Sequence, residues 1–94
     1  MLNKKYQNQI KNTILKHFAG NVKIFIFGSS VESKKFSDVD VGIIGKGVDK
    51  SKLSLIREEL ENSLIPYEID LIDFNEVDEK FKEKVFKGKI VWII

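Results

Sequence analysis

Two aspartates, Asp38 and Asp40, are the residues of this sequence whose type and spacing best suit chemistry. They lead into an apolar run at 41–44, so we expect them on a strand, where alternation points both carboxylates to the same face. Their Cα atoms would lie roughly 7 Å apart at about 3.3 Å per residue, and a divalent cation would offset their repulsion. The alternative interpretation is that Asp38 belongs to a turn and Asp40 is an ordinary exposed strand position.

A turn suited to phosphate precedes these aspartates. Residues 22–27 are apolar except for Lys23, which predicts a strand buried on both faces. The strand stops at Gly28, Ser29 and Ser30, where glycine permits a close approach of the backbone and the hydroxyls supply donors without bulk. We therefore predict that these three residues bind phosphate.

A glycine-serine turn followed by two aspartates resembles the signature of the nucleotidyltransferase superfamily that includes DNA polymerase β and kanamycin nucleotidyltransferase. The matching residues are Phe27, Gly28, Ser29, Ser37, Asp38, Val39 and Asp40. The resemblance covers nearly the whole chain, whose size is most similar to that of the minimal nucleotidyltransferases (MNT). Members of that group are found beside HEPN proteins in prokaryotic toxin-antitoxin pairs.

The resemblance implies a third carboxylate on a later strand. The strand-like run at 67–74 offers Asp70, which matches the family pattern. Glu68 shares the face of Asp70 under strict alternation and is the reserve candidate, whereas Asp73 falls on the other face.

The chain also departs from the family pattern. Minimal members commonly carry an arginine soon after the glycine-serine turn, and this chain instead has Ser30, Val31, Glu32 and Ser33. Serine does not replace the planar fork with which arginine binds phosphate. Lys34 and Lys35 follow directly and are expected to take over this contact, with plain solvated charge as the alternative.

The resemblance further implies how these residues act. Asp38, Asp40 and Asp70 would hold Mg²⁺, with two ions expected during catalysis, and Asp70 would alternatively take the proton of the attacking hydroxyl. ATP would be the substrate, with its phosphates held by Gly28 and Ser29. The product would be AMP on a hydroxyl acceptor, which the minimal group implies is a tyrosine of a HEPN-type toxin, so the chain would act as an antitoxin.

Two other functions fit the same residues. The first is a non-catalytic MNT-fold module that binds and masks a HEPN partner, which the missing arginine and the apolar run at 91–94 motivate. The second is a small nucleotide sensor that binds without turnover. Aligned carboxylates favour catalysis, because a surface that only binds a partner has no need of them.

Three helices and a last strand are expected around the site. Apolar side chains at intervals of four predict a first helix, which ends at 19–21 with Gly20 as its cap; they are Leu2, Tyr6, Ile10, Ile14 and Phe18. His17 lies in its last turn and is expected to be structural.

A second helix is expected to begin at Asp49 or Ser51 and to bury Leu53, Ile56, Leu60 and Leu64. Its other face is expected to be solvated, with Arg57, Glu58, Glu61 and Asn62. A third helix is expected to begin at Asn75 and end at Gly88, with an apolar face formed by Val77, Phe81 and Val85. Residues 89–94 predict a final strand, with Trp92 in the core or at an interface.

This order of elements predicts a single α/β domain, residues 1–94, with a mixed sheet of about four strands flanked by helices and with neighbouring carboxylate strands. A formal charge of +2 argues against a duplex nucleic acid partner, and no apolar run reaches the roughly eighteen residues of a membrane span. The lack of cysteine and of an apolar leader predicts a cytoplasmic location. A homo-oligomer remains an open expectation.

Overall fold

A computed structural model of the protein describes residues 1–18 and 21–94, and these form four helices and a four-stranded sheet. In chain order the elements are α1 (Lys4–Leu15), β1 (Val22–Phe27), α2 (Ser29–Glu32), β2 (Asp38–Gly45), α3 (Lys50–Glu61), β3 (Glu68–Asp73), α4 (Glu79–Lys87) and β4 (Val91–Trp92). The strand order is β3-β2-β1-β4. β1 runs antiparallel to both β2 and β4, whereas β2 runs parallel to β3. The predicted α/β fold with a mixed sheet is confirmed.

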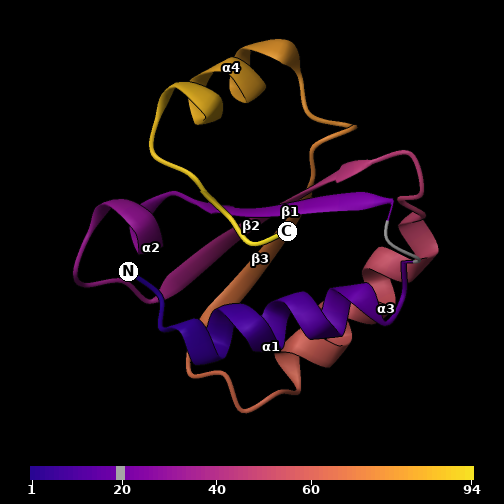
Figure 1. Cartoon of the computed structure of the whole chain (residues 1–94), viewed down its shortest axis with the longest axis horizontal. Coiled ribbons are helices and arrows are strands. Elements are labelled where there is room, and N and C mark those ends of the chain that lie inside the picture. The colour runs from indigo at the N-terminus through magenta and orange to yellow at the C-terminus, as the bar shows by residue number, and fades with distance from the viewer. Residues whose placement is uncertain (19–20) are drawn as a thin grey trace.

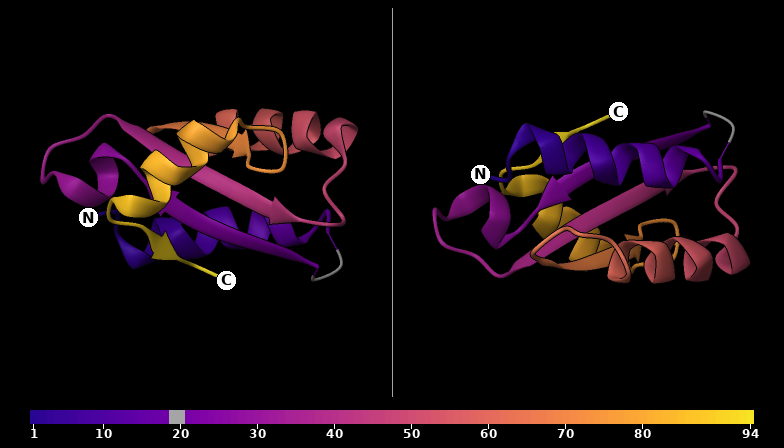
Figure 2. Two further views of the ribbon diagram at one scale, coloured as in Figure 1. Left: turned by 90° about the horizontal axis from the view of Figure 1, so that it is seen from above. Right: turned by 90° about the horizontal axis from the view of Figure 1, so that it is seen from below.

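The sheet forms the middle layer of the molecule, with α1 and α3 on one face and α4 on the other (Figure 1). Views from the two opposite sides show α4 crossing its face alone, while α1 and α3 lie next to each other (Figure 2). α3 is the crossover that parallel β2 and β3 require. None of the helices within residues 1–18 and 21–94 has the length and apolar character of a membrane span.

The larger core lies between the sheet and the pair α1 and α3. β2 buries Val39, Val41 and Ile43 because alternate side chains of a strand point to the same face. The helices contribute side chains spaced by three or four residues, namely Ile10, Ile14, Leu53, Ile56 and Leu60. The same alternation sends the aspartates of β2 to the opposite face.

A smaller aromatic core fills the space between the sheet and α4. Phe25, Phe27 and Phe74 are its buried members, and the ring centroids of Phe25 and Phe74 lie 4.7 Å apart, edge to face. Phe25 lies across from Gly42 of β2, where any Cβ atom would collide with the phenyl ring. This core leaves the start of β2 uncovered, and Asp38 is exposed there.

The predicted helix boundaries after β2 are partly confirmed. Asp49 caps α3 by accepting a hydrogen bond of 2.9 Å from the main-chain amide two residues on, and α4 ends at Gly88. The expectation that Asn75 caps the last helix is wrong, because Asp78 does so. Asn75 instead donates to the carbonyl of Gly45 at 2.8 Å, which ties the loop after β3 to the end of β2.

The expectation that Leu64 is buried on the second helix is also wrong. α3 ends at Glu61, and Leu64 lies beyond it with 94% of its surface exposed. Ile65 enters the core from this loop. Helical spacing predicts burial only while the chain remains helical.

The first helix, α1, and the last strand, β4, are both shorter than expected. α1 ends at Leu15, and Gly20, its expected cap, lies outside the described residues. β4 covers only Val91 and Trp92, although the next two amides both donate to the carbonyl of Ile24. Trp92 is 49% exposed, so its ring is only partly in the core.

Candidate functional site

The parallel pairing of β2 and β3 brings the predicted carboxylates together. In the register, Asp40 lies opposite Asp70 and Asp38 lies opposite Glu68. All four therefore share the sheet face away from α1 and α3, which confirms that the carboxylate strands are neighbours. Asp73 falls on the other face, where it accepts a hydrogen bond of 2.9 Å from a main-chain amide of the following turn.

These carboxylates line a hollow of about 270 Å³. Its lining residues are Asp38, Asp40, Glu68, Ile69 and Asp70. Partial burial raises the pKa of the Asp40 carboxyl above its usual 3.8, and the negative charges of Asp70 and then Asp38 raise it further. The hollow therefore contains more negative charge than the surrounding residues compensate, and this favours a cation.

The glycine of the predicted phosphate turn lies against Asp40. Phe27 pairs with Asp40 across β1 and β2, and Gly28 follows with a φ of +78°. A Cβ atom at Gly28 would collide with the carboxylate of Asp40, so only glycine lets the turn and the carboxylate approach so closely. α2 begins directly afterwards at Ser29 and packs at the same end of the sheet (Figure 1).

The two serines of the turn differ in exposure. Ser29 is exposed at the first position of α2. Ser30 is completely buried, and among the described residues its hydroxyl has no hydrogen-bond partner. The hydroxyl of Ser30 does not reach the hollow in this structure, so a phosphate contact from it requires a local movement.

Lys34 and Lys35 are exposed on the loop between α2 and β2. Ser33 braces this loop, because its hydroxyl donates to the carbonyl of Lys35 at 3.0 Å. The rings of Phe36 and Tyr67 stack with their centroids 4.8 Å apart, which ties the approach to β2 to the approach to β3. The loop is thus held at the carboxylate end of the sheet, with its lysines on the surface.

The oxygen atoms of the carboxylates are ligands that suit Mg²⁺. Within residues 1–18 and 21–94, no three histidine, cysteine, aspartate or glutamate side chains converge into a ready-made metal cluster. Mg²⁺ takes oxygen ligands, keeps several waters and commonly uses one or two carboxylates together with substrate phosphates. Asp38 and Asp40, beside a turn suited to phosphate, fit this coordination.

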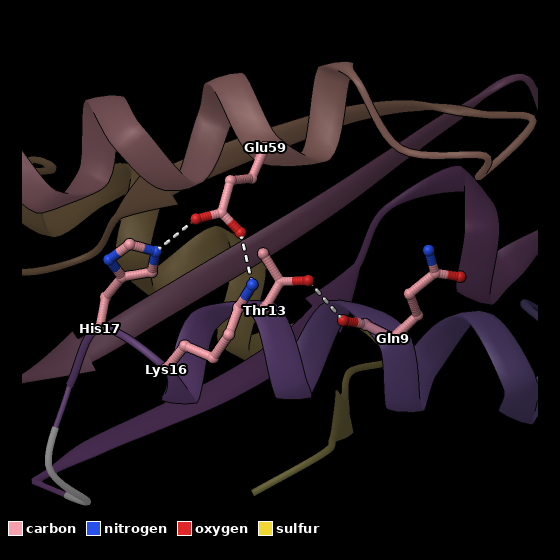
Figure 3. Close-up of polar contacts among 5 residues, drawn as sticks. All are labelled: Gln9, Thr13, Lys16, His17 and Glu59. Atoms are coloured by element: carbon pink, nitrogen blue, oxygen red, sulfur yellow. Dashed lines mark hydrogen bonds and ion pairs between the residues drawn. The ribbon is translucent and has the colours of Figure 1, made fainter.

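The only histidine of the chain belongs to a second polar cluster, on the α1 and α3 side (Figure 3). The Nε2 atom of His17 and the Oε1 atom of Glu59 are 2.8 Å apart, and Lys16 donates to the other oxygen of Glu59 at 2.8 Å. One turn earlier, Thr13 donates to the carbonyl of Gln9. The hydrogen bond from Lys16, followed by the contact with His17, lowers the pKa of Glu59. This cluster joins α1 to α3 and lies on the face opposite the carboxylate hollow.

Arg57 is the residue near the site that the sequence did not single out. Helical spacing places it on the solvated face of α3, yet its guanidinium donates to the carbonyl of Leu71 from Nη2 at 2.8 Å and from Nε at 3.3 Å. Leu71 directly follows Asp70 on β3. The contact depends on how far a long side chain reaches around a sheet edge, which periodicity does not indicate. The one available signal is that Arg57 is the single arginine of the chain.

Sequence comparison finds relatives over almost the whole chain. Residues 8–93 match the family described as "Polymerase beta, Nucleotidyltransferase". A protein of Haemophilus influenzae named "Probable protein adenylyltransferase MntA" is 32% identical over 85 residues, which cover 87% of this chain and 75% of that protein.

Solved structures with the same fold include toxin-antitoxin pairs. A mutant of the toxin-antitoxin MntA-HpeT matches with a TM-score of 0.73 and 18% identity, covering 99% of this chain and 73% of that chain. A toxin-antitoxin with AMP-PNP matches with a TM-score of 0.73 and 18% identity, covering 94% and 72%. A tri-AMPylated Shewanella oneidensis HEPN toxin in complex with MNT antitoxin matches with a TM-score of 0.63 and 19% identity, covering 94% and 71%. At such identities the likeness establishes the fold.

Proposed function

We propose that this chain, which belongs to the Polymerase beta, Nucleotidyltransferase family, transfers AMP from ATP to a hydroxyl group of a partner protein. The protein acceptor is supported by the 32% identity to a relative named as a protein adenylyltransferase. Likeness to toxin-antitoxin structures supports a HEPN-type toxin as the partner. We take a tyrosine of that toxin as the acceptor, so the chain acts as an antitoxin.

The observation that carries this proposal is the placement of Asp40 and Asp70 opposite each other, with Gly28 against Asp40. Like charges on neighbouring strands destabilise a sheet unless something else compensates them. Partial burial raises the pKa of Asp40, and the negative charges of Asp70 and then Asp38 raise it further. A nucleotide that arrives with a divalent cation brings both the positive charge and the phosphates that the site suits.

Each residue of the hollow has a proposed role. Asp38 and Asp40, with Asp70 as a further ligand, would hold Mg²⁺, which when bound neutralises charge on the phosphates of ATP. The amide of Gly28 and the exposed Ser29 hold the outer phosphates. Two ions during catalysis, as the family resemblance implies, remain part of the proposal.

Lys34 and Lys35 are proposed to add positive charge to the outer phosphates. Both are exposed on the loop between α2 and β2. An ammonium group binds phosphate as a point charge and needs no fixed geometry, so exposed lysines on this loop suit the role. Ser30 is proposed to contact phosphate only after a local movement, because its hydroxyl is buried and makes no hydrogen bond among the described residues.

The transfer itself is an in-line displacement at the α phosphorus of ATP. The acceptor oxygen forms a bond to this phosphorus, the bond from the phosphorus to the bridging oxygen breaks, and pyrophosphate leaves with that oxygen. Asp70 receives the proton of the acceptor hydroxyl. Glu68 is the alternative third carboxylate, but it lies opposite Asp38, whereas the charge of Asp70 acts directly on Asp40.

A labelling experiment tests the proposal. The protein is incubated with Mg²⁺, ATP labelled in the α phosphate and a HEPN-type protein from the same genome. We expect label on the partner with the wild type, and none with Asp38→Asn or Asp40→Asn. Glu58→Gln is the matched control, because Glu58 is an exposed carboxylate of α3 outside the carboxylate hollow. Loss of labelling in the control, or labelling by both aspartate variants, would refute the assignment.

A non-catalytic module that masks a partner is the second candidate. Trp92 is 49% exposed and Ile94 is 40% exposed, and these apolar side chains favour a protein contact at β4. This candidate predicts a stable complex with the HEPN-type protein and no transferred label. The same incubation, followed by size-exclusion chromatography, separates the two functions.

A further inference from the structure

We propose that Arg57 and the hollow beside it form the subsite for the acceptor protein, which approaches the site across the outer edge of β3. This inference rests on the proposed transfer reaction, because it assigns the second substrate of the same site. The strand order, the open edge of β3 and the position of the Arg57 guanidinium carry it.

The strand order gives the site two sides. Gly28 follows β1, Asp40 lies on β2 and Asp70 lies on β3, in that spatial order. A nucleotide with its outer phosphates at Gly28 therefore occupies the β1 and β2 side. In an in-line displacement the attacking oxygen enters opposite the leaving pyrophosphate, so the acceptor hydroxyl arrives from the β3 side.

The outer edge of β3 is open to an arriving protein. β3 is the last strand on this side of the sheet formed by the described residues. The amides of Glu68 and Phe74 donate to carbonyls on the β2 side, so the main-chain groups of the intervening odd residues point outward. Among these is the carbonyl of Leu71, which meets Arg57 instead of a neighbouring strand.

Two hollows flank Arg57, and both also reach Asp70. They measure about 340 Å³ and about 510 Å³. The smaller one shares Glu68, Ile69 and Asp70 with the carboxylate hollow, so both hollows border the same segment of β3. Its remaining walls are Arg57, Leu60, Glu61, Tyr67 and Leu71. This mixture of apolar side chains and carboxylates suits an aromatic ring whose hydroxyl points toward Asp70.

The guanidinium of Arg57 has N–H groups that remain available to a second partner. Its contact with the carbonyl of Leu71 uses two of its five N–H groups. Arg57 is also not part of any ion pair formed within residues 1–18 and 21–94. Arginine binds carboxylates and carbonyl oxygens through the remaining fork. The acceptor that fits is therefore a polypeptide segment that carries an aromatic hydroxyl with an acidic side chain or an exposed carbonyl close to it.

Steady-state kinetics with both substrates varied tests this assignment. KM is measured separately for ATP and for the HEPN-type acceptor protein with the wild type, Arg57→Ala, Arg57→Lys and Lys52→Ala. Lys52 is the matched control, because it is an exposed cation of α3 directed toward the ring of Phe18 on α1's side. We expect Arg57→Ala to raise KM for the acceptor about tenfold or more, the scale of one lost charged hydrogen bond, with KM for ATP unchanged. Arg57→Lys restores part of the loss, and Lys52→Ala matches the wild type.

Two results would overturn the assignment. A rise in KM for ATP would place Arg57 with the phosphates. Unchanged KM values with only a lower kcat or Tm would mean that Arg57 merely braces Leu71. If the wild type transfers no AMP at all, the proposed function fails separately, and the affinity for the acceptor protein without ATP decides the subsite. Roughly tenfold weaker binding by Arg57→Ala supports it, and equal binding refutes it.

Discussion

The carboxylates of the sheet and the carboxylate of Glu59 occupy opposite electrostatic surroundings. Burial and two neighbouring aspartates raise the pKa of Asp40. Hydrogen bonds from Lys16 and His17 lower the pKa of Glu59. The chain compensates the charge of Glu59 with its own side chains and leaves the charge of Asp40 to be compensated by a ligand.

This difference separates a structural cluster from a candidate site. A histidine beside a glutamate has the residue types of an acid-base pair, yet His17 and Glu59 join two helices that pack on the core. Asp38 and Asp40 have no such partner among the ion pairs of the described residues. Uncompensated charge beside a glycine turn is a stronger indication of ligand binding than the presence of acid-base residue types.

The largest expected difference between the two clusters comes from neutralising one carboxylate in each and comparing AMP transfer. Asp40→Asn should reduce AMP transfer at least about 100-fold, the scale seen when an enzyme loses one electrostatic stabiliser of the transition state. Glu59→Gln should leave transfer within about twofold of the wild type, because its contacts lie on the other face of the sheet. Single-turnover labelling of the partner measures both. Comparable losses in the two variants would remove the distinction between the clusters.

Gly28→Ala should have the next largest effect. Its φ of +78° is strained for alanine, and the new Cβ atom would collide with the carboxylate of Asp40. We expect a loss of about 1–3 kcal/mol in the free energy of unfolding, together with loss of transfer. Gly47→Ala is a suitable control, because a Cβ atom there would have its nearest neighbour at 3.8 Å. Chemical denaturation of both variants provides the measurement, and a normally active Gly28→Ala would contradict the proposed phosphate turn.

Alternation made the carboxylate site predictable from the sequence. A period of two places Asp38 and Asp40 on one face regardless of how the rest of the chain packs, and the parallel pairing then brings Asp70 alongside. The α/β fold was predictable for the same reason, because each buried strand and helix carries its own periodic pattern. The roles of the site residues remain predictions.

The contacts of long side chains and loops were not predictable from local patterns. Leu64 fits the spacing of a helix that has already ended, and Asn75 serves a distant loop instead of a helix cap. Arg57 reaches around the edge of β3, and Glu59 meets a helix more than forty residues earlier, at the pair Lys16 and His17. Each of these depends on how separate elements are packed, which a single strand or helix pattern does not encode.

The two carboxylates should also differ in how they change stability with pH, and this effect is smaller. Because the folded protein holds the proton of Asp40 more tightly than the unfolded chain, metal-free stability should fall as pH rises from the usual 3.8 through the raised pKa. Asp40→Asn should flatten this fall and raise Tm near neutral pH by a few degrees. Thermal unfolding across this pH range measures it. An unchanged pH profile in the variant would mean that Asp40 carries no uncompensated charge.

The smallest effect is expected for Glu59, whose charge is compensated by Lys16 and His17. Its contribution to stability should change with pH in the opposite direction to that of Asp40. The lowered pKa of Glu59 means that its contribution to stability is present above the usual 4.5 and is lost as pH falls through the lowered folded value. Glu59→Gln should therefore lower Tm slightly at neutral pH and make no difference in acid. High salt should weaken the contribution further, because Lys16 is largely exposed. A rise in Tm on Glu59→Gln, like that expected for Asp40→Asn, would show that both carboxylates are strained by their surroundings. The contrast between the compensated charge of Glu59 and the uncompensated charge of Asp40 would then have no physical basis.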